Sequence, residues 1–230
     1  MVLSAVIAGS IAGALLTFVQ MFTTAPLIAQ AEIYEQGGTP PAAASAAAAH
    51  DHGASTWEPK DGFERTFYTG VTTVLTAIGY ALLLGAVFSQ LRRVGWKTGL
   101  GLGIAGFLIF QLAPAIGLPP GPPGSPYADL GARQIWWVST ALATALALGA
   151  WWYARSHSKA IWIPVGIVLI LLPHLIGAPQ PVPGQTTILP PELTQRFAIM
   201  ALFTAGVFWL VLGSVQGFVF NKLGQRRAFG

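Results

Sequence analysis

Histidine and carboxylate side chains form the densest group of potential metal ligands in this chain. His50 and His52 flank Asp51 within a segment, residues 32–62, that is rich in Ala, Pro and Gly. Two histidines one residue apart lie on the same side of an extended segment, and the carboxylate between them adds oxygen donation. Such donors suit cobalt(II), nickel, copper and zinc, so the trio predicts transient, weak capture of a divalent cation. The alternative, that the trio is ordinary solvated polar sequence, is as well supported by these residues alone.

His174 is the second candidate, because it stands at the end of a long apolar segment. An ionisable side chain there is costly unless it is paired or faces water, which favours a place on an ion pathway. Its alternative role is a hydrogen bond to a backbone carbonyl that the neighbouring Pro173 leaves free. His157, between Arg155 and Lys159, is better explained as a solvated loop residue.

Charged residues beside the apolar segments extend this set. We hypothesise that they join His174 around an outer vestibule that concentrates a divalent cation: Asp61, Glu64, Asp129, Arg133 and Glu192. Asp129 and Arg133 are four residues apart, a spacing that also allows a purely structural ion pair across one helical turn. The spacing of these residues along the chain does not show that they converge in space.

Several kinds of chemistry are excluded or left without a motif. The chain has no cysteine, which rules out disulfides and thiolate-bound metals or clusters. It has no Walker motif, serine nucleophile elbow or zinc-protease signature, so no enzyme activity and no tightly bound cofactor are predicted. The run Gly99–Gly103 follows no strand and is explained better by close helix packing than by phosphate binding. Transport would draw on an ion gradient, the membrane potential or another subunit.

Composition identifies the element type that must position these residues. Of the 230 residues 53% are hydrophobic and only 9% are charged, too few for the surface of a soluble domain. Six stretches approach the roughly 20 apolar residues that a spanning helix needs: 2–31, 66–91, 98–116, 134–154, 160–178 and 197–220. We therefore predict an all-α integral membrane protein, a single polytopic domain over residues 1–230 with about six transmembrane helices. The lipid bilayer, and not nucleic acid, is the expected partner of its surface.

The placement of charge predicts the orientation of these helices. If the amino terminus is cytoplasmic, the inner loops and tail hold eight basic residues and no acid: Arg92, Arg93, Lys97, Arg155, Lys159, Lys222, Arg226 and Arg227. All eight acids then fall on the outer side, together with the four remaining basic residues. Lysine and arginine favour cytoplasmic loops, so both termini are predicted to be cytoplasmic.

The first segment has an alternative interpretation. Ala29-Gln30-Ala31 resembles a signal-peptidase site, which would remove this segment on export. The segment lacks a basic amino-terminal region and is longer than a usual signal core. Its small residues suit close helix packing in lipid instead: Ser4, Ala8, Gly9, Ala12 and Gly13.

Tryptophans cluster near the expected helix ends. This placement is typical of interfacial aromatic belts, and we assign them no chemistry: Trp136, Trp137, Trp151, Trp152, Trp162 and Trp209.

Motifs spread over nearly the whole chain together resemble one family. The sequence is similar to the CbtA family, proposed membrane subunits of bacterial cobalt transporters. The residues that carry the resemblance are His50-Asp51-His52, the stretch 57–68 (WEPKDGFERTFY), 111–120 (QLAPAIGLPP), 128–137 (ADLGARQIWW), 173–181 (PHLIGAPQP), Phe208-Trp209 and Leu212-Gly213. Their order and spacing form a specific combination, although no single motif is diagnostic.

The resemblance implies a function and a partner. It implies a role in cobalt uptake linked to cobalamin metabolism, and a small His-bearing membrane partner, CbtB. The family is usually described with five spans, and cleavage after Ala31 or an interfacial first segment would reconcile that number with six. The outer loop carries only two histidines here, which argues against high-capacity metal capture.

We therefore hypothesise a multi-pass protein of the bacterial inner membrane that helps to take up cobalt(II), or nickel. His50, Asp51 and His52 supply at most part of the four to six donors that cobalt(II) takes, so water or a partner must supply the rest. Polar groups at membrane depth are sparse, which favours a rival: a structural or assembly subunit of a larger membrane complex without transport of its own. A membrane-embedded enzyme is the weakest rival, because no catalytic constellation is present.

Overall fold

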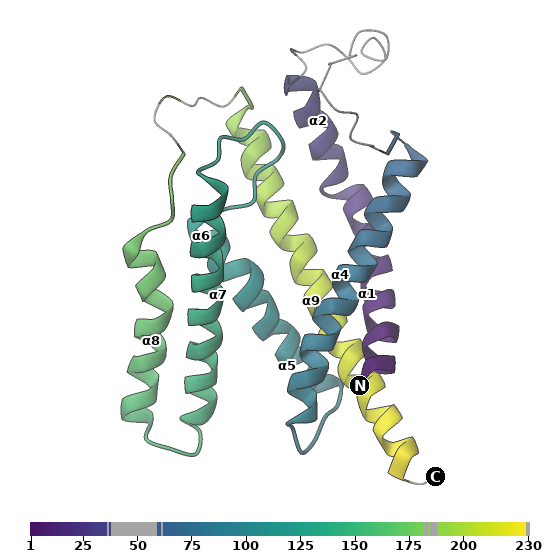
Figure 1. The fold of residues 1–230 in the computed structure, drawn as a ribbon, viewed down its shortest axis with the longest axis vertical. Helices are drawn as coiled ribbons and strands as arrows, with labels where there is room; N and C mark the ends of the chain where they lie inside the picture. Colours follow the sequence, from purple (N-terminus) through teal and green to yellow (C-terminus); the bar gives the residue numbers. More distant parts are fainter. Residues whose placement is uncertain (36, 38–58, 61, 182–183, 185–187, 229–230) are drawn as a thin grey trace.

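The computed structural model describes residues 1–35, 37, 59–60, 62–181, 184 and 188–228. These residues form helices and loops but no strand (Figure 1). Six helical stretches are long and apolar enough to cross a membrane: Val2–Phe22, Phe63–Ser89, Trp96–Gly117, Leu130–Tyr153, Lys159–Ile176 and Pro191–Gly224. Within the part of the chain that is described, the predicted all-α fold with about six spans is confirmed.

The first apolar segment is two helices and not one. Helix α1 (Val2–Phe22) ends before Thr23, and α2 (Ala25–Glu35) continues beyond a turn. Pro26 explains the break, because it has no N–H to donate and its ring would clash with the carbonyl four residues earlier. The hydroxyl of Thr23 lies 2.9 Å from that of Thr204 on the last helix, which ties the bend to the bundle.

Helix α1 packs along α4 (Phe63–Ser89) through the small residues that the sequence suggested. A Cβ atom on Gly9 would lie 2.5 Å from the Ile78 Cα atom, and one on Gly13 would lie 2.7 Å from the Val74 Cα atom. Only glycine permits so close an approach of two helix backbones. Because Ala5, Ala8 and Ala12 are also buried, removal of this segment would strip the bundle of one of its packing faces.

The last helix, α9 (Pro191–Ala228), crosses α5 (Trp96–Phe107) at a second glycine contact. A Cβ atom on Gly99 would run into the carbonyl of Gly213, and one on Gly103 would run into the carbonyl of Trp209. Gly101, on the opposite face of α5, meets nothing within 4 Å. The predicted packing role of the glycine run is confirmed for Gly99 and Gly103. The face of α5 that carries these two glycines packs against α9, whereas the face that carries Gly101 does not.

The third span changes its helical pitch in its second half. Helix α5 continues through a π-helical turn, η1 (Leu108–Leu112), into the short α6 (Ala113–Gly117). Pro114 cannot donate to the carbonyl of Phe110, and the wider turn accommodates that missing hydrogen bond. The Phe110 ring stacks on that of Trp209, with centroids 5.5 Å apart and planes 3° apart.

Two of the tryptophans near the expected helix ends are buried within the bundle. Trp209 is 1% exposed and Trp136 is 7% exposed. The Trp209 ring fills the space that Gly106 leaves on α5, so the ring belongs to the core of the bundle. The sequence did not indicate this burial, because position along a helix does not show which face a residue occupies.

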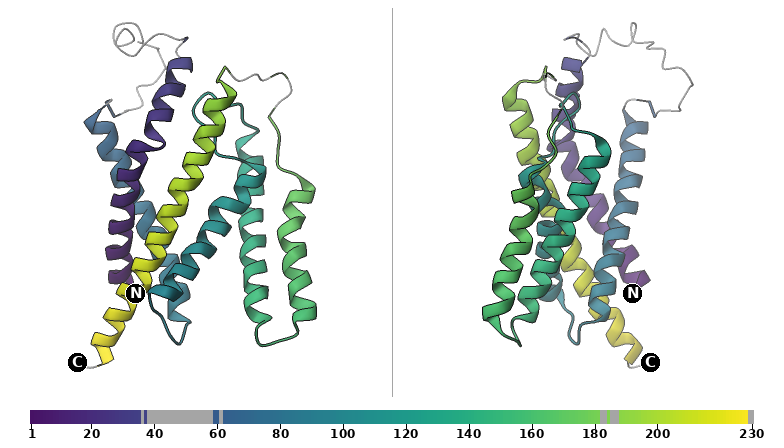
Figure 2. Two further views of the ribbon diagram at one scale, coloured as in Figure 1. Left: turned by 180° about the vertical axis from the view of Figure 1, so that it is seen from behind. Right: turned by 60° about the vertical axis from the view of Figure 1, so that its left-hand side comes forward.

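Helices α7 (Leu130–Tyr153) and α8 (Lys159–Ile176) form a hairpin at one side of the bundle (Figures 1 and 2). Gly166 of α8 leaves room for the Trp151 ring of α7, whose Nε1 donates to the carbonyl of Ile163 at 3.2 Å. This bond occurs near Pro164, which lies inside α8 together with Pro173. The remaining face of α8 is apolar and exposed, which suits contact with lipid.

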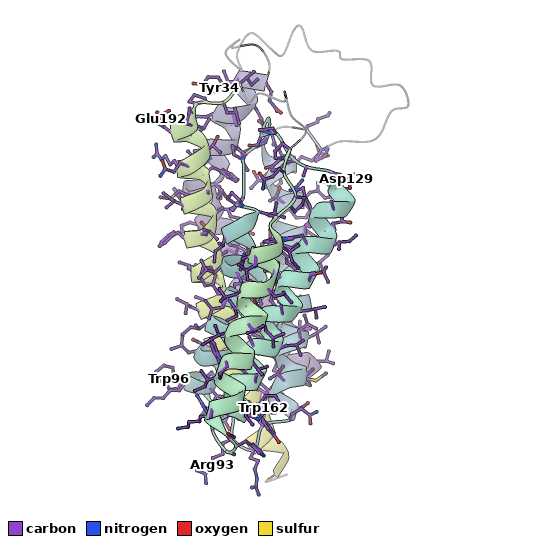
Figure 3. All side chains as sticks on the ribbon, turned by 90° about the vertical axis from the view of Figure 1, so that its left-hand side faces the viewer. Tyr34, Arg93, Trp96, Asp129, Trp162 and Glu192 are labelled. Carbon is purple, nitrogen blue, oxygen red and sulfur yellow. The ribbon has the colours of Figure 1, made fainter. Side chains whose placement is uncertain are left out.

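Charge divides the two ends of the bundle. Both termini lie at one end, which also carries the connections α4–α5 and α7–α8 with Arg92, Arg93 and Arg155 (Figures 1 and 3). The opposite end, called the outer end below, carries Tyr34, Asp129 and Glu192 (Figure 3). This separation agrees with the charge partition in the sequence, while the membrane side that each end faces remains a prediction.

We predict that Gly99→Ala lowers the free energy of unfolding by about 1–3 kcal/mol, because the new methyl group overlaps the α9 backbone. Thermal unfolding of the purified chain in detergent would measure the change. Gly101→Ala is the matched control, since nothing lies within 4 Å of that position. Equal stability of the two variants would contradict the proposed crossing.

Candidate functional site

Three hollows open at the outer end of the bundle. One lies between α1, α2 and α4 and has a volume of about 300 Å³; we call it the α1–α4 groove. A second, of about 410 Å³, lies between α2 and the start of α9, and we call it the α2–α9 groove. The third, of about 650 Å³, lies between the proline-rich 118–121 stretch and α7; we call it the α7 pocket. Each contains at least one charged side chain, so each is a candidate for ion or ligand binding.

An ion pair lies at the α1–α4 groove. The guanidinium of Arg65 engages both carboxylate oxygens of Glu32, with Nη1 donating to Oε2 at 3.4 Å and Nη2 contacting Oε1. The two side chains are 47% and 29% exposed. An exposed pair of this kind contributes only about 0–1 kcal/mol to stability. The ion pair therefore contributes little to the stability of the fold, but it fixes one negative and one positive group at the groove.

Neutral oxygen atoms line the same groove. The Oε1 atom of Gln20 is buried and has no hydrogen-bond partner among the described residues. Thr17 donates its hydroxyl to the carbonyl of Gly13 at 3.0 Å, and Thr66 donates to that of Gly62 at 2.9 Å. Because these hydroxyl hydrogens are used, the oxygen lone pairs are what the threonines can offer to a ligand. The groove thus combines a carboxylate with amide and hydroxyl oxygens, which are donors that hard and borderline cations accept.

The residues predicted to capture the metal, His50, Asp51 and His52, lie outside the described residues, as does Asp61. The segment that contains them joins α2 to α4, the helices that flank the α1–α4 groove. The described parts of the chain contain no group of three or more His, Cys, Asp or Glu side chains able to hold a metal.

His174 lies near the outer end of α8, in contact with α7. Its ring centroid is 5.7 Å from that of Trp136, with the planes at 67°. The Trp136 Nε1 and the Gly177 N–H both donate to the carbonyl of Pro173, at 3.3 and 3.1 Å, which fixes the backbone beside the imidazole. The Nε2 atom of His174 is buried without a hydrogen-bond partner in the described structure. It can therefore offer one nitrogen to a ligand.

Asp129 and Arg133 do not form the ion pair that their spacing suggested. Asp129 is the N-cap of α7, and its Oδ1 accepts a hydrogen bond from the Ala132 N–H at 2.9 Å. Arg133 turns away from it, and the guanidinium carbon lies 4.1 Å from the centroid of the Tyr127 ring. The pair does not form because the free N–H groups at the start of the helix compete for the carboxylate and an aromatic face competes for the cation.

The other predicted acids stand on separate elements around the rim. Glu64 belongs to the first turn of α4, and its Oε2 accepts from the backbone N–H of Lys60 at 3.3 Å. Glu192 belongs to the first turn of α9 and lines the α2–α9 groove with Arg196. Helix α8, with His174, lies on the opposite side of the bundle from α1 and α4 (Figures 1 and 2). The described members of the predicted vestibule are thus distributed around the outer end.

Sequence reasoning overlooked Glu32 and Gln20 as site residues. Glu32 was counted only as one of the outer acids, and Gln20 only as one of the few polar residues at membrane depth. The signal available was the position of Gln20 three residues after Thr17, which places both on one helix face. The pairing of Glu32 with Arg65, 33 residues apart, depends on the packing of α2 beside α4 and has no local signal.

A comparison with protein families decides what kind of protein carries these grooves. The family model described as "Probable cobalt transporter subunit (CbtA)" matches residues 1–221, which is nearly the whole chain. The chain belongs to the CbtA family. No curated protein and no solved structure matches the chain.

Membership in CbtA agrees with the fold and defines the class of function. The six apolar helices and the family description together make the chain a multi-pass membrane subunit of a transporter. The family is one of transporter subunits and not of enzymes. As a subunit, the CbtA chain functions with at least one partner in a transporter complex.

The capping role of Asp129 can be separated from any role of its charge. We expect Asp129→Asn to retain the stability of the wild type, because an amide oxygen also caps a helix, whereas Asp129→Ala should cost about 1 kcal/mol. Thermal unfolding in detergent would compare the two variants. If Asp129→Asn keeps its stability but takes up less cobalt, the charge itself belongs to the ion pathway.

Proposed function

We propose that this chain is the membrane subunit through which cobalt(II), and nickel in second place, enters a bacterial cell for use in cobalamin metabolism. Capture would occur at His50, Asp51 and His52, on the outer side of the inner membrane, and the small partner CbtB would complete the transporter. The observation that carries the proposal is the α1–α4 groove, where Glu32, Gln20 and threonine oxygens meet between the helices that the capture segment joins.

The chain connectivity supports a hand-over from the capture segment to the groove. That segment leaves α2 after Glu35 and returns at Phe63 of α4. Glu32 lies within one helical turn of the end of α2, and Arg65 lies in the first turn of α4. A cation released by the histidines would therefore have a carboxylate close to both attachment points of the segment.

The ion pair provides a means of selection at this point. Arg65 occupies the position beside Glu32 that a cation would take, so an incoming divalent ion must displace the guanidinium. A divalent ion carries twice the charge of the guanidinium, so at the same distance its Coulomb attraction to the carboxylate is twice as strong. In this proposal a divalent cation competes successfully where a monovalent cation does not.

His174 is the second candidate entrance in this proposal. Its unpartnered Nε2 supplies a nitrogen donor of the kind that cobalt(II) prefers. Asp129, Arg133 and Glu192 stand around the same end and set the local potential, while Glu64 lies at the first turn of α4. A route through His174 and one through the α1–α4 groove lie on different sides of the bundle, so substitutions can separate them.

We predict that Glu32→Gln lowers cobalt(II) uptake by about tenfold or more, because an amide retains the shape but loses the attraction for the ion. Uptake of radioactive cobalt(II) by cells that express the chain together with its partner would measure the effect. The double substitution His50→Ala/His52→Ala should lower uptake mainly at limiting cobalt, where capture governs the rate. His174→Ala tests the second entrance in the same assay.

Glu35→Gln is the matched control, since Glu35 is an exposed acid on the same helix and does not line the groove. Variants must reach the membrane in equal amounts, as judged by immunoblotting. Equal uptake by Glu32→Gln and Glu35→Gln would exclude the groove as the route, whereas a selective loss in His174→Ala would move the entrance to α8.

A structural or assembly subunit is the second candidate function. It is favoured by the lack of any group of three metal-binding side chains in the described structure and by the broad apolar face of α8. Under this alternative the chain would co-purify with a large membrane partner, and the amount of that assembled partner would fall when the chain is deleted. Loss of cobalt uptake in the Glu32→Gln variant, with the complex intact, would argue against it.

A further inference from the structure

The α7 pocket contains a positive charge that a cation pathway does not explain. Arg133 lies in the first turn of α7 and lines this pocket of about 650 Å³. Its Nε atom is buried and has no hydrogen-bond partner among the described residues. A guanidinium is permanently charged and repels a divalent cation, so its ligand should be an anion.

Neighbouring residues hold the guanidinium in place without neutralising it. The Tyr127 ring supports it from one side, with its centroid 4.1 Å from the guanidinium carbon. Tyr127 is itself held, since its hydroxyl donates to the carbonyl of Gly121 at 2.8 Å. Asp129, the acid closest in sequence, is engaged at the start of the helix. The arrangement therefore presents a fixed cation with donor capacity left over.

The pocket walls leave few other groups to bind an anion. Pro119 and Pro120 have no N–H to donate, and the Tyr127 hydroxyl hydrogen is already used. Gln134, which also lines the pocket, can add an amide donor beside Arg133. An oxyanion with several acceptor oxygens matches this pair, since guanidinium groups bind such anions through two parallel hydrogen bonds.

The surroundings indicate that the anion is attached to an apolar chain. Leu130 and Val138 line the pocket and are 63% and 47% exposed, so the hollow opens onto the lipid-facing surface of the bundle. Trp137 also lines the pocket, and tryptophan is typical of the depth at which lipid headgroups lie. Arg133 stands one turn into a spanning helix, where the same depth is expected.

We propose that the α7 pocket binds the phosphate of an anionic phospholipid, with Arg133 and Gln134 on the phosphate oxygens and the acyl chains running inward along Val138. This site is independent of the route through the α1–α4 groove, because it involves a different helix and an anion. The bound lipid would fasten the proline-rich 118–121 stretch to the start of α7 and so stabilise this side of the outer end.

Native mass spectrometry of the purified full-length chain in detergent tests the proposal. We expect phosphatidylglycerol to bind more tightly than phosphatidylcholine, and Arg133→Gln to weaken phosphatidylglycerol binding by about tenfold. Arg133→Lys should give an intermediate loss, since it keeps the charge but not the planar pair of donors. Arg196→Gln, the same change at an exposed arginine of the outer end, should leave binding unchanged.

Each alternative result has a definite meaning. Equal binding of the two lipids, or equal effects of Arg133→Gln and Arg196→Gln, would overturn the proposal. Inorganic phosphate is the probe for a soluble ligand, measured by thermal stabilisation of the same protein. If phosphate alone stabilises the wild type as much as phosphatidylglycerol does, the ligand is a soluble anion and the lipid assignment fails. Circular dichroism of each variant confirms that the helices remain folded.

Discussion

The crossing of α5 and α9 at Gly99, Gly103 and Gly213 is the contact on which the rest of the bundle depends. Within lipid there is little hydrophobic drive for helices to associate, so close backbone contact must supply the attraction. These glycines bring the two helix backbones together, and Gly106 leaves the space that the Trp209 ring fills. Phe110 and Tyr80 then pack against Trp209, which joins the third span, α4 and α9 into one core.

This core leaves the outer ends of the helices free to diverge and carry the polar groups. Helix α9 has 38 residues and is about 57 Å long, well beyond the roughly 30 Å of a bilayer core. Its first turns pack with α2 through Leu27, Leu193 and Phe197. The polar side chains of the candidate site therefore lie at the outer end of the bundle, where the α1–α4 groove contains the Glu32–Arg65 pair.

The fold was largely predictable from the sequence because the bilayer allows few solutions. The lengths of the apolar segments predicted six spans, which the structure confirms among the described residues. The small residues of α1 and the run Gly99–Gly103 correctly indicated packing faces. The break before Pro26 and the burial of Trp209 were missed, because both depend on how neighbouring helices pack. The candidate site was harder, since Glu32 and Arg65 meet only through tertiary structure and Asp129 prefers its own helix end to Arg133. The metal-binding role of His50, Asp51 and His52 stays a prediction.

The central claim is that this CbtA chain admits cobalt(II) through its own outer end. The most direct measurement is radioactive cobalt(II) uptake at limiting concentration in cells from which the chain has been deleted, with and without the wild-type chain restored. The account predicts that deletion abolishes most high-affinity uptake and that the restored chain recovers it while its partner is present. Unchanged uptake after deletion would contradict the account and leave the chain as a structural subunit.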